Sequence, residues 1–180
     1  VEQSRKRLDH MKARGTTTIE IKTGYGLEPK LENIQLAVID ELRGQASADT
    51  IFATALAHVI PLDRRGNRKE YIDEFCREVL EPAALKKRVQ FCDVFVESGA
   101  YTPEECRYIC EKAKVLGLQI KLHVDQLHEA GGAALAADLG ALSADHLEMT
   151  SAQGRKALAE AGTIATILPG CGLFLGGENW

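Results

Sequence analysis

Several features that would point to common functions are absent from this 180-residue chain. No apolar run reaches the roughly 18 residues that a membrane-spanning helix needs. No Gly-x-Gly-x-x-Gly motif follows an apolar run, which argues against a dinucleotide-binding domain. The net charge is −4, and the densest basic run, residues 64–69, reads as a solvated loop rather than a binding site. We therefore expect a protein that binds neither membranes nor nucleic acid.

Cysteines are few and form no recognisable framework. None of the five is in Cys-x-x-Cys spacing, so neither a set of disulfides nor a zinc ribbon is indicated. Cys92 lies in a strand-like run and should be buried. Cys106 and Cys110 share one helical face and should pack there. An odd number of cysteines without a framework fits a reducing compartment, and we expect a cytoplasmic location.

Six apolar runs alternate with helical patterns along the chain. The runs are rich in Val, Ile, Thr and Leu without strict alternation, which is typical of strands buried on both faces of a parallel sheet. The clearest helix start is Thr102, with Pro103 at the first helical position and Glu105 completing a capping box. The predicted strands are Thr16–Lys22, Thr50–His58, Cys92–Glu97, Ile120–Asp125, Ala141–Leu147 and Thr163–Pro169. This alternation predicts right-handed β-α-β units.

Two architectures fit such a pattern, a doubly wound open sheet and a (β/α)8 barrel. A doubly wound sheet concentrates its site at one switch point, whereas a barrel collects residues from many strand ends around one mouth. Polar residues follow most of the predicted strands, at Lys22 and Tyr25, His58, Glu97, His123 and His146. We therefore predict the barrel. A complete barrel takes about 250 residues, so we expect one or two strands outside this sequence, which also begins without Met.

His123 and His146 end two successive predicted strands. Both would lie at the C-terminal face of the barrel, where barrel enzymes keep their chemistry. Neutral imidazole at a strand end is a rigid ligand for Zn²⁺ or Fe²⁺. Further ligands would come from His146, from Asp125 or from outside the sequence, and His146 could instead be a base beside the attacking water. The plainer alternative is that each His only caps its strand.

Four other side chains are candidates for a polar site. Tyr25 lies between two glycines, which permit a sharp turn that would push the ring outward. His58 ends the second predicted strand. Gln126 follows the fourth, where its amide could both donate to and accept from a polar heterocycle. Glu97 could bind a ligand or Lys22. Each of these could also be an ordinary loop residue.

Taken together, six motifs closely resemble the imidazolonepropionase family of the metal-dependent amidohydrolase superfamily. They are Glu20–Leu27, Ala57-His58, Phe91–Glu97, Lys121–Gln126, Leu142–Leu147 and Leu168–Gly170, in this order and spacing. The resemblance covers nearly the whole chain. It implies an α/β fold, a (β/α)8 TIM barrel of the amidohydrolase type, here incomplete with about strands 2 to 7. In the full protein a small β-sandwich built from both termini would accompany this barrel domain fragment, residues 1–180.

The resemblance also implies an activity. This is hydrolysis of the cyclic amide 4-imidazolone-5-propanoate to N-formimidoyl-L-glutamate in histidine degradation, with one Zn²⁺ or Fe²⁺ per chain. By position, His123 resembles the metal-binding His and His146 the catalytic His beside the attacking water. Tyr25, His58 and Gln126 match substrate-binding positions. A homodimer would be in keeping with the family.

The sequence departs from the family at several positions. The His-x-His of the first strand, the Asp of the last strand and the Arg that holds the propionate are absent, and we expect them in the full-length protein. Gln126 stands where some members carry Glu, and an amide cannot shuttle a proton. Two alternatives stay open: another cyclic-amide hydrolase or deaminase of the superfamily, or a non-catalytic barrel fragment whose open sheet edges would favour aggregation.

Overall fold

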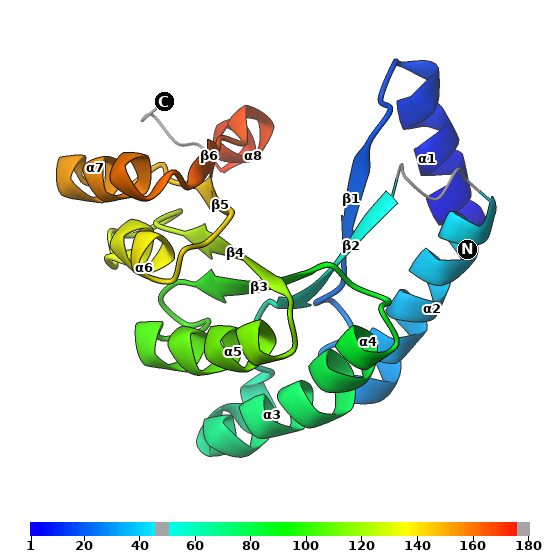
Figure 1. Ribbon diagram of the computed structural model, residues 1–180, viewed down its shortest axis with the longest axis horizontal. Coiled ribbons are helices and arrows are strands. Elements are labelled where there is room, and N and C mark those ends of the chain that lie inside the picture. The colour runs from blue at the N-terminus through cyan, green and yellow to red at the C-terminus, as the bar shows by residue number, and fades with distance from the viewer. Residues whose placement is uncertain (46–50, 176–180) are drawn as a thin grey trace.

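The computed structural model describes residues 1–45 and 51–175. Six parallel strands form one sheet in chain order: Ile19–Lys22 (β1), Ile51–Ala57 (β2), Phe91–Val96 (β3), Gln119–Val124 (β4), Ser143–His146 (β5) and Ile164–Thr166 (β6). Within the described residues the strand order never reverses, so the sheet has no switch point of the doubly wound kind. The sheet curves into an arc with β1 and β6 at its ends (Figure 1). The predicted incomplete barrel is confirmed.

Each strand falls close to its predicted range. Thr50, the first residue predicted for the second strand, lies outside the described residues. The last strand is shorter than predicted because Pro169, placed there at its end, instead begins a helix. Proline has a fixed φ and no N–H, so it suits the first turn of a helix better than a strand interior.

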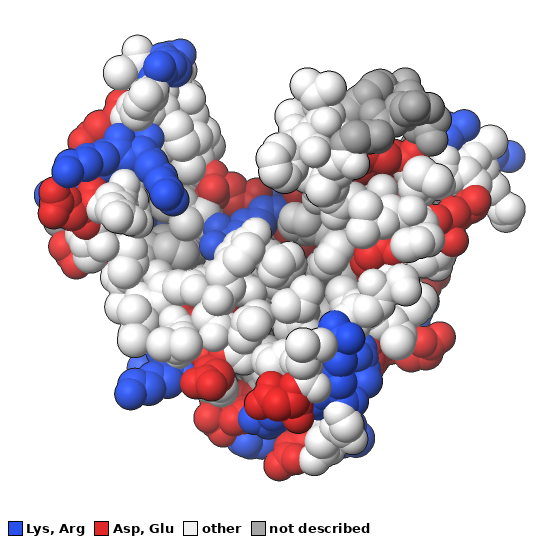
Figure 2. Space-filling model, turned by 180° about the vertical axis from the view of Figure 1, so that it is seen from behind, with Lys and Arg blue, Asp and Glu red and all other residues white. Residues whose placement is uncertain are grey.

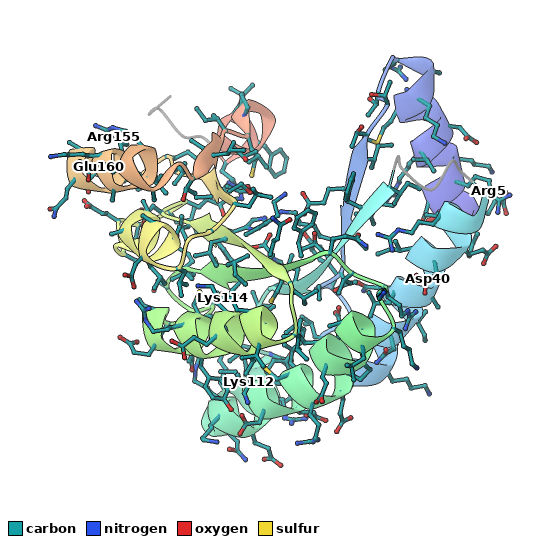
Figure 3. The ribbon with its side chains drawn as sticks, in the orientation of Figure 1. Arg5, Asp40, Lys112, Lys114, Arg155 and Glu160 are labelled. Carbon is teal, nitrogen blue, oxygen red and sulfur yellow. The ribbon has the colours of Figure 1, made fainter. Side chains whose placement is uncertain are left out.

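Helices cover the outer, convex side of the arc (Figure 1). They are Glu2–Ala13 (α1), Pro29–Gln45 (α2), Arg68–Phe75 (α3), Glu81–Leu85 (α4), Pro103–Val115 (α5), Gly132–Asp138 (α6) and Ala152–Ala161 (α7). The short helix Pro169–Phe174 (α8) lies on the other side of β6 from α7 (Figure 1). The charged side chains labelled in Figure 3, among them Asp40, Lys112 and Glu160, belong to these outer helices. No helix in the described part of the chain has the length and apolar character that a bilayer-crossing segment requires.

The basic run at residues 64–69 is helical rather than a loop. Leu62–Asn67 forms a 3₁₀ turn, and α3 follows directly at Arg68. Most of these residues are exposed, as predicted. Arg64 and Arg68 are half-buried: Arg64 donates to Glu74 at 2.6 Å, and the Arg68 guanidinium donates to both carboxylate oxygens of Glu105 at 2.6 and 2.5 Å. The run therefore joins α3 to the start of α5 and is not a free basic patch.

The helix α5 begins and packs as the sequence predicts. Thr102 Oγ1 accepts from the Glu105 N–H at 3.2 Å, and the Glu105 carboxylate accepts from the Thr102 N–H at 2.9 Å. Cys106 and Cys110 are fully buried on its inner face, with their Sγ atoms 3.8 Å apart, and Cys92 is fully buried in β3. These thiols are core residues, and burial raises the pKa of Cys92 well above its ordinary value.

The two faces of the sheet differ in polarity. Side chains that point outward to the helices are apolar and buried, such as Val94, Leu122 and Ala144. The alternate positions on the concave face carry charge, and register places His123 between Phe95 and Asp145. Viewed from behind, the surface is hollowed between the two ends of the arc, and acidic and basic side chains gather at the floor of this hollow (Figure 2). The fold thus places polar chemistry inside the arc.

Candidate active site

A half-buried lysine joins two buried carboxylates on the concave face. Lys22 Nζ donates to Asp93 Oδ2 and to Asp145 Oδ2, at 2.8 Å in each case. These residues come from β1, β3 and β5, alternate strands that contribute side chains to the same interior layer of a barrel. Burial tends to lower the pKa of Lys22, but Asp93 and Asp145 raise it above its ordinary value. Lys22 is therefore a permanent cation in this site.

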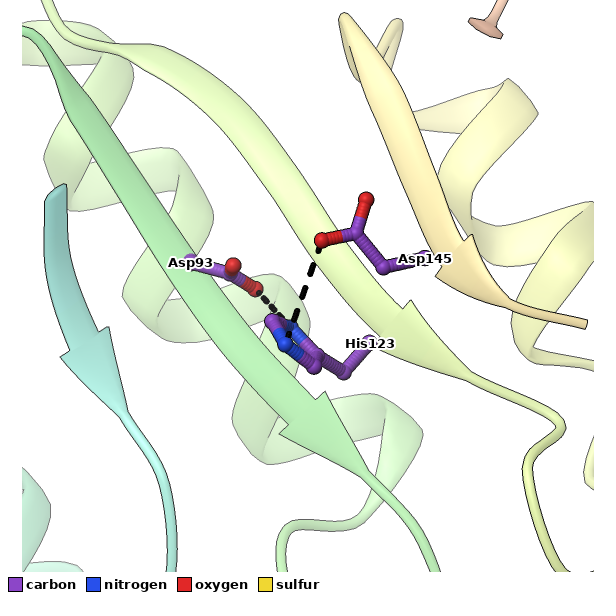
Figure 4. Close-up of side chains that lie close together, drawn as sticks. All are labelled: Asp93, His123 and Asp145. Atoms are coloured by element: carbon purple, nitrogen blue, oxygen red, sulfur yellow. Dashed lines mark hydrogen bonds and ion pairs between the residues drawn. The ribbon is translucent and has the colours of Figure 1, made fainter. Parts of the chain in front are cut away.

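His123 completes the cluster. Its Nδ1 lies 2.9 Å from Asp93 Oδ1, and its Nε2 lies 3.9 Å from Asp145 Oδ2 (Figure 4). Burial alone would raise the pKa of Asp93, but His123 and Lys22 lower it to about 2. Asp93 is therefore an ionised acceptor, and His123 donates its Nδ1 proton to it. Sequence reasoning named His123 but gave Asp93 no role, and the only local signal was a lone acid within an apolar strand.

The cluster contains a donor set suited to a divalent metal ion. Asp93, His123 and Asp145 each offer one ligand atom, and these atoms lie within 4.8 Å of one another. Imidazole nitrogen and carboxylate oxygen are ligands that Zn²⁺ and Fe²⁺ accept. That His123 holds a metal ion stays a prediction.

Asp125, which the sequence offered beside His146 as a further metal ligand, makes its hydrogen bonds elsewhere. Its carboxylate accepts from the backbone N–H groups of Ala130, Gly132 and Ala133 at 3.0–3.1 Å, and from the Thr150 hydroxyl at 3.2 Å. It therefore caps the start of α6. The proposal of Asp125 as a ligand was wrong because the strand ends at Val124 and the chain turns at Asp125 with φ 51°.

Four of the five predicted site residues lie in a row of rings. Ring centroids are 4.7 Å apart for Tyr25 and His58, and 5.3 Å apart for His123 and His146. Phe95 links the two pairs, 5.7 Å from His58 and 6.3 Å from His123. Sequence reasoning missed Phe95, which reads as one more apolar strand residue. The row forms an aromatic wall beside the charged cluster.

His146 reaches the site through an unusual backbone. Strict alternation would turn Asp145 and His146 to opposite faces of β5, yet both lie beside His123. The chain bends there, with φ 81° at His146 and 73° at Leu147, a region that costs a non-glycine residue about 1–3 kcal/mol. Burial, followed by the nearby His123, lowers the pKa of His146, so the ring is neutral near pH 7. Its Nδ1 lies 3.6 Å from Glu148 Oε1.

The turn that carries Tyr25 is wound around a buried carboxylate. Glu32 accepts from the N–H groups of Gly24, Gly26 and Leu27 at 2.7, 2.6 and 3.0 Å. A Cβ at Gly26 would lie 2.7 Å from the Glu32 backbone nitrogen, so this turn needs glycine. The Tyr25 side chain is thereby presented outward, 70% exposed, as predicted.

The turn that carries Gln126 is anchored in the same way. Glu97 accepts from the Leu127 N–H at 2.8 Å and from His128 Nδ1 at 2.8 Å. The suggested pairing of Glu97 with Lys22 was therefore wrong, because Glu97 ends its strand at the mouth and turns to the neighbouring loop. Gln126 itself donates to Cys171 Sγ at 3.5 Å.

Solved structures of low sequence identity share this architecture. A Xaa-Pro dipeptidase superposes with a TM-score of 0.58 at 19% identity, covering 89% of this chain and 44% of that one. An ochratoxinase from A. niger gives 0.53 at 16% identity, covering 83% and 41%. These are amidohydrolase-type folds, and the class of the chain is an incomplete (β/α)8 barrel of that type.

Sequence comparison then identifies which proteins of this fold the chain resembles. The chain is 48% identical over 168 residues to the imidazolonepropionase of Clostridium tetani, covering 93% of this chain and 40% of that protein. It is 43% identical over 176 residues to that of Mesorhizobium japonicum, covering 97% and 43%. No protein-family model matches the chain. The resemblance to the imidazolonepropionases is confirmed along nearly the whole chain, which spans about two fifths of the length of these relatives.

Proposed function

We propose that the protein containing this chain is an imidazolonepropionase. It hydrolyses a carbon–nitrogen bond of the cyclic amide 4-imidazolone-5-propanoate and releases N-formimidoyl-L-glutamate in the degradation of histidine. The observation that carries the proposal is the row of Tyr25, His58, His123 and His146 beside a charged cluster, within a chain 48% identical to an enzyme of that name. Its substrate is a small molecule, and its proposed location is the cytoplasm.

His123 is the residue of this chain that would hold the metal ion. Because its Nδ1 is engaged with Asp93, Nε2 is the nitrogen left to bind. A bound Zn²⁺ or Fe²⁺ supplies an activated water and polarises the substrate carbonyl. We propose one ion per chain, completed by a His-x-His pair and an Asp that lie on strands outside this sequence.

The other residues orient the substrate and move a proton. His146, neutral at pH 7 because burial lowers its pKa, can take a proton or stabilise the developing oxyanion. Since Nδ1 lies toward Glu148, Nε2 is the atom that would act. His58 and Tyr25 would lie against the flat ring, and the amide of Gln126 would hydrogen-bond to it. Gln126 cannot shuttle a proton, so His146 alone would transfer it.

The chain is one barrel fragment, residues 1–180, and the full protein adds the missing strands and a small β-sandwich. The full protein forms a homodimer. Another cyclic-amide hydrolase or deaminase is the competing activity, and it would use the same His123 and His146 with a different pocket.

The test measures metal content and hydrolysis of 4-imidazolone-5-propanoate on one preparation of the full-length protein. We expect about one metal ion per chain together with turnover. A matched control is Val115→Ala, because Val115 is 89% exposed on the outer side of α5 and should change neither quantity. Bound metal without turnover would refute 4-imidazolone-5-propanoate as the substrate and favour the competing activity. Neither metal nor turnover would leave only the barrel.

A further inference from the structure

The cluster of Asp93, His123 and Asp145 already contains a cation. The Lys22 ammonium makes 2.8 Å hydrogen bonds to Asp93 Oδ2 and Asp145 Oδ2, and its side chain is 19% exposed. Both carboxylates are buried, so each needs a positive partner to remain ionised. An ammonium that bridges two carboxylates takes the place that a divalent ion would otherwise take between them.

The same arrangement determines what Asp93 does. Its second oxygen, Oδ1, accepts from His123 Nδ1 at 2.9 Å, so the two oxygens divide between Lys22 and His123. A carboxylate bonded to one imidazole nitrogen fixes the tautomer and the orientation of the ring, and leaves the other nitrogen as a metal ligand. Asp93 is thus occupied on both oxygens by partners within the chain.

We infer that Lys22 is the resident cation of this cluster, which excludes a metal ion from Asp93 and Asp145 and makes Asp93 a positioning residue for His123. The metal ion of the proposed function then binds on the Nε2 side of His123 only. The inference rests on that proposed function for the role of His123. With Lys22 in place, a second ion does not enter a donor set that is otherwise suitable.

A second half-buried lysine provides a matched control. Lys121 lies on the same concave face, its side chain is 14% exposed, and it pairs with Glu20. Lys121 contacts one carboxylate rather than bridging two, and among the described residues no hydrogen bond or ion pair joins it to His123. Removing its charge should therefore disturb the lining of the barrel without opening a site between Asp93 and Asp145.

The first experiment titrates metal-free full-length protein with Co²⁺ and follows its visible absorption. Wild type, Lys121→Met and the charge-retaining Lys22→Arg should each bind about one equivalent. Lys22→Met should bind a second equivalent, because the two buried carboxylates of Asp93 and Asp145 lose the cation that bridges them. A folded Lys22→Met protein that still binds one equivalent would overturn the inference, and so would a second equivalent in Lys121→Met.

Two further measurements do not depend on the folding of Lys22→Met. A slowly exchanging Lys22 ammonium should be visible by nitrogen-detected NMR in the wild-type protein and should persist when one equivalent of metal is bound. Loss of that signal on metal binding would contradict the inference. Asp93→Asn should weaken metal binding about 10- to 100-fold in competition with a chelator, whereas unchanged affinity would remove the positioning role.

Different outcomes would refute the proposed function and the inference about Lys22. Wild type that binds about one metal ion but does not hydrolyse the imidazolone refutes the proposed substrate and leaves the role of Lys22 intact. A wild type that binds no metal, with one equivalent gained in Lys22→Met, refutes the proposed metal at His123 while supporting the inference. The reverse pattern, full turnover with an unchanged Lys22→Met stoichiometry, refutes the inference alone.

Discussion

The two faces of β4 show two different uses of one strand. Leu122 and Val124 point outward and are completely buried under the helices. Lys121 and His123 point inward and pair with Glu20 and Asp93. The outer face stabilises the fold through apolar contact, whereas the inner face sets charges and ring orientations. Mutations on the two faces should therefore affect different quantities, and this difference can be measured.

The largest expected effect is on the outer face. Leu122→Ala removes a fully buried side chain, and large-to-small substitutions in a core cost about 2–5 kcal/mol in the free energy of unfolding. Urea unfolding of the full-length protein measures this cost. Metal stoichiometry of the folded fraction should stay at the wild-type value. A change in stoichiometry without a loss of stability would break the comparison between the two faces.

On the inner face, His146→Ala should act on catalysis instead. Loss of one group that stabilises a developing oxyanion costs roughly 3 kcal/mol in the barrier, so we expect kcat to fall about 100-fold or more. His146→Ala removes one ring from the row but leaves the helix-facing core intact. The free energy of unfolding should therefore fall much less than in Leu122→Ala. Full turnover in this variant would refute the catalytic role of His146.

A smaller effect is expected on the pH dependence of stability, through Glu97, the carboxylate that anchors the Gln126 turn. Burial would raise the pKa of Glu97, but the N–H groups of Leu127 and Ser98 and the side chain of His128 lower it below its ordinary value of 4.5. Because the folded pKa is the lower one, the stabilisation is complete above about pH 4.5 and is lost as pH falls through the folded pKa. Glu97→Gln should therefore show a flatter loss of stability on acidification, measured by urea unfolding from pH 6 to 3. Equal acid slopes in the two proteins would exclude this role.

The fold was predictable from the sequence because each strand has its own local signal. Runs rich in Val, Ile and Thr mark β2, β3 and β4, and the Thr102 capping box marks α5. The site was predictable only in part. Strand-end residues such as His123 and Tyr25 stand out locally, and their roles stay predictions. Lys22 meets Asp93 and Asp145 across 71 and 123 residues of sequence, and no local pattern records such a pairing.

Asp125 and Glu97 show that a strand-end acid can be mistaken for a site residue. Both follow strands, which is where catalytic acids lie in barrels, and the sequence offered Asp125 as a metal ligand and Glu97 as a partner for a bound ligand or for Lys22. The structure uses them for backbone N–H groups, which must find acceptors wherever a chain turns beside a buried strand end. An acid after a strand therefore has two competing uses, and only the position of the next helix decides between them.

The smallest expected effect is at the start of α5, the helix that packs on the outer face of β3. Thr102→Ala removes the hydroxyl that accepts from the Glu105 N–H at the start of α5, and loss of such a cap costs about 1 kcal/mol. Thr102→Ser, which keeps the hydroxyl, is the matched control and should stay near wild type in urea unfolding. Neither variant should alter Co²⁺ stoichiometry or kcat, because α5 touches β3 only from the helix side, while Asp93 and Phe95 face the other way. A fall in kcat with the cap variant would mean that the two faces are coupled through β3, and the separation argued for β4 would not extend to its neighbour.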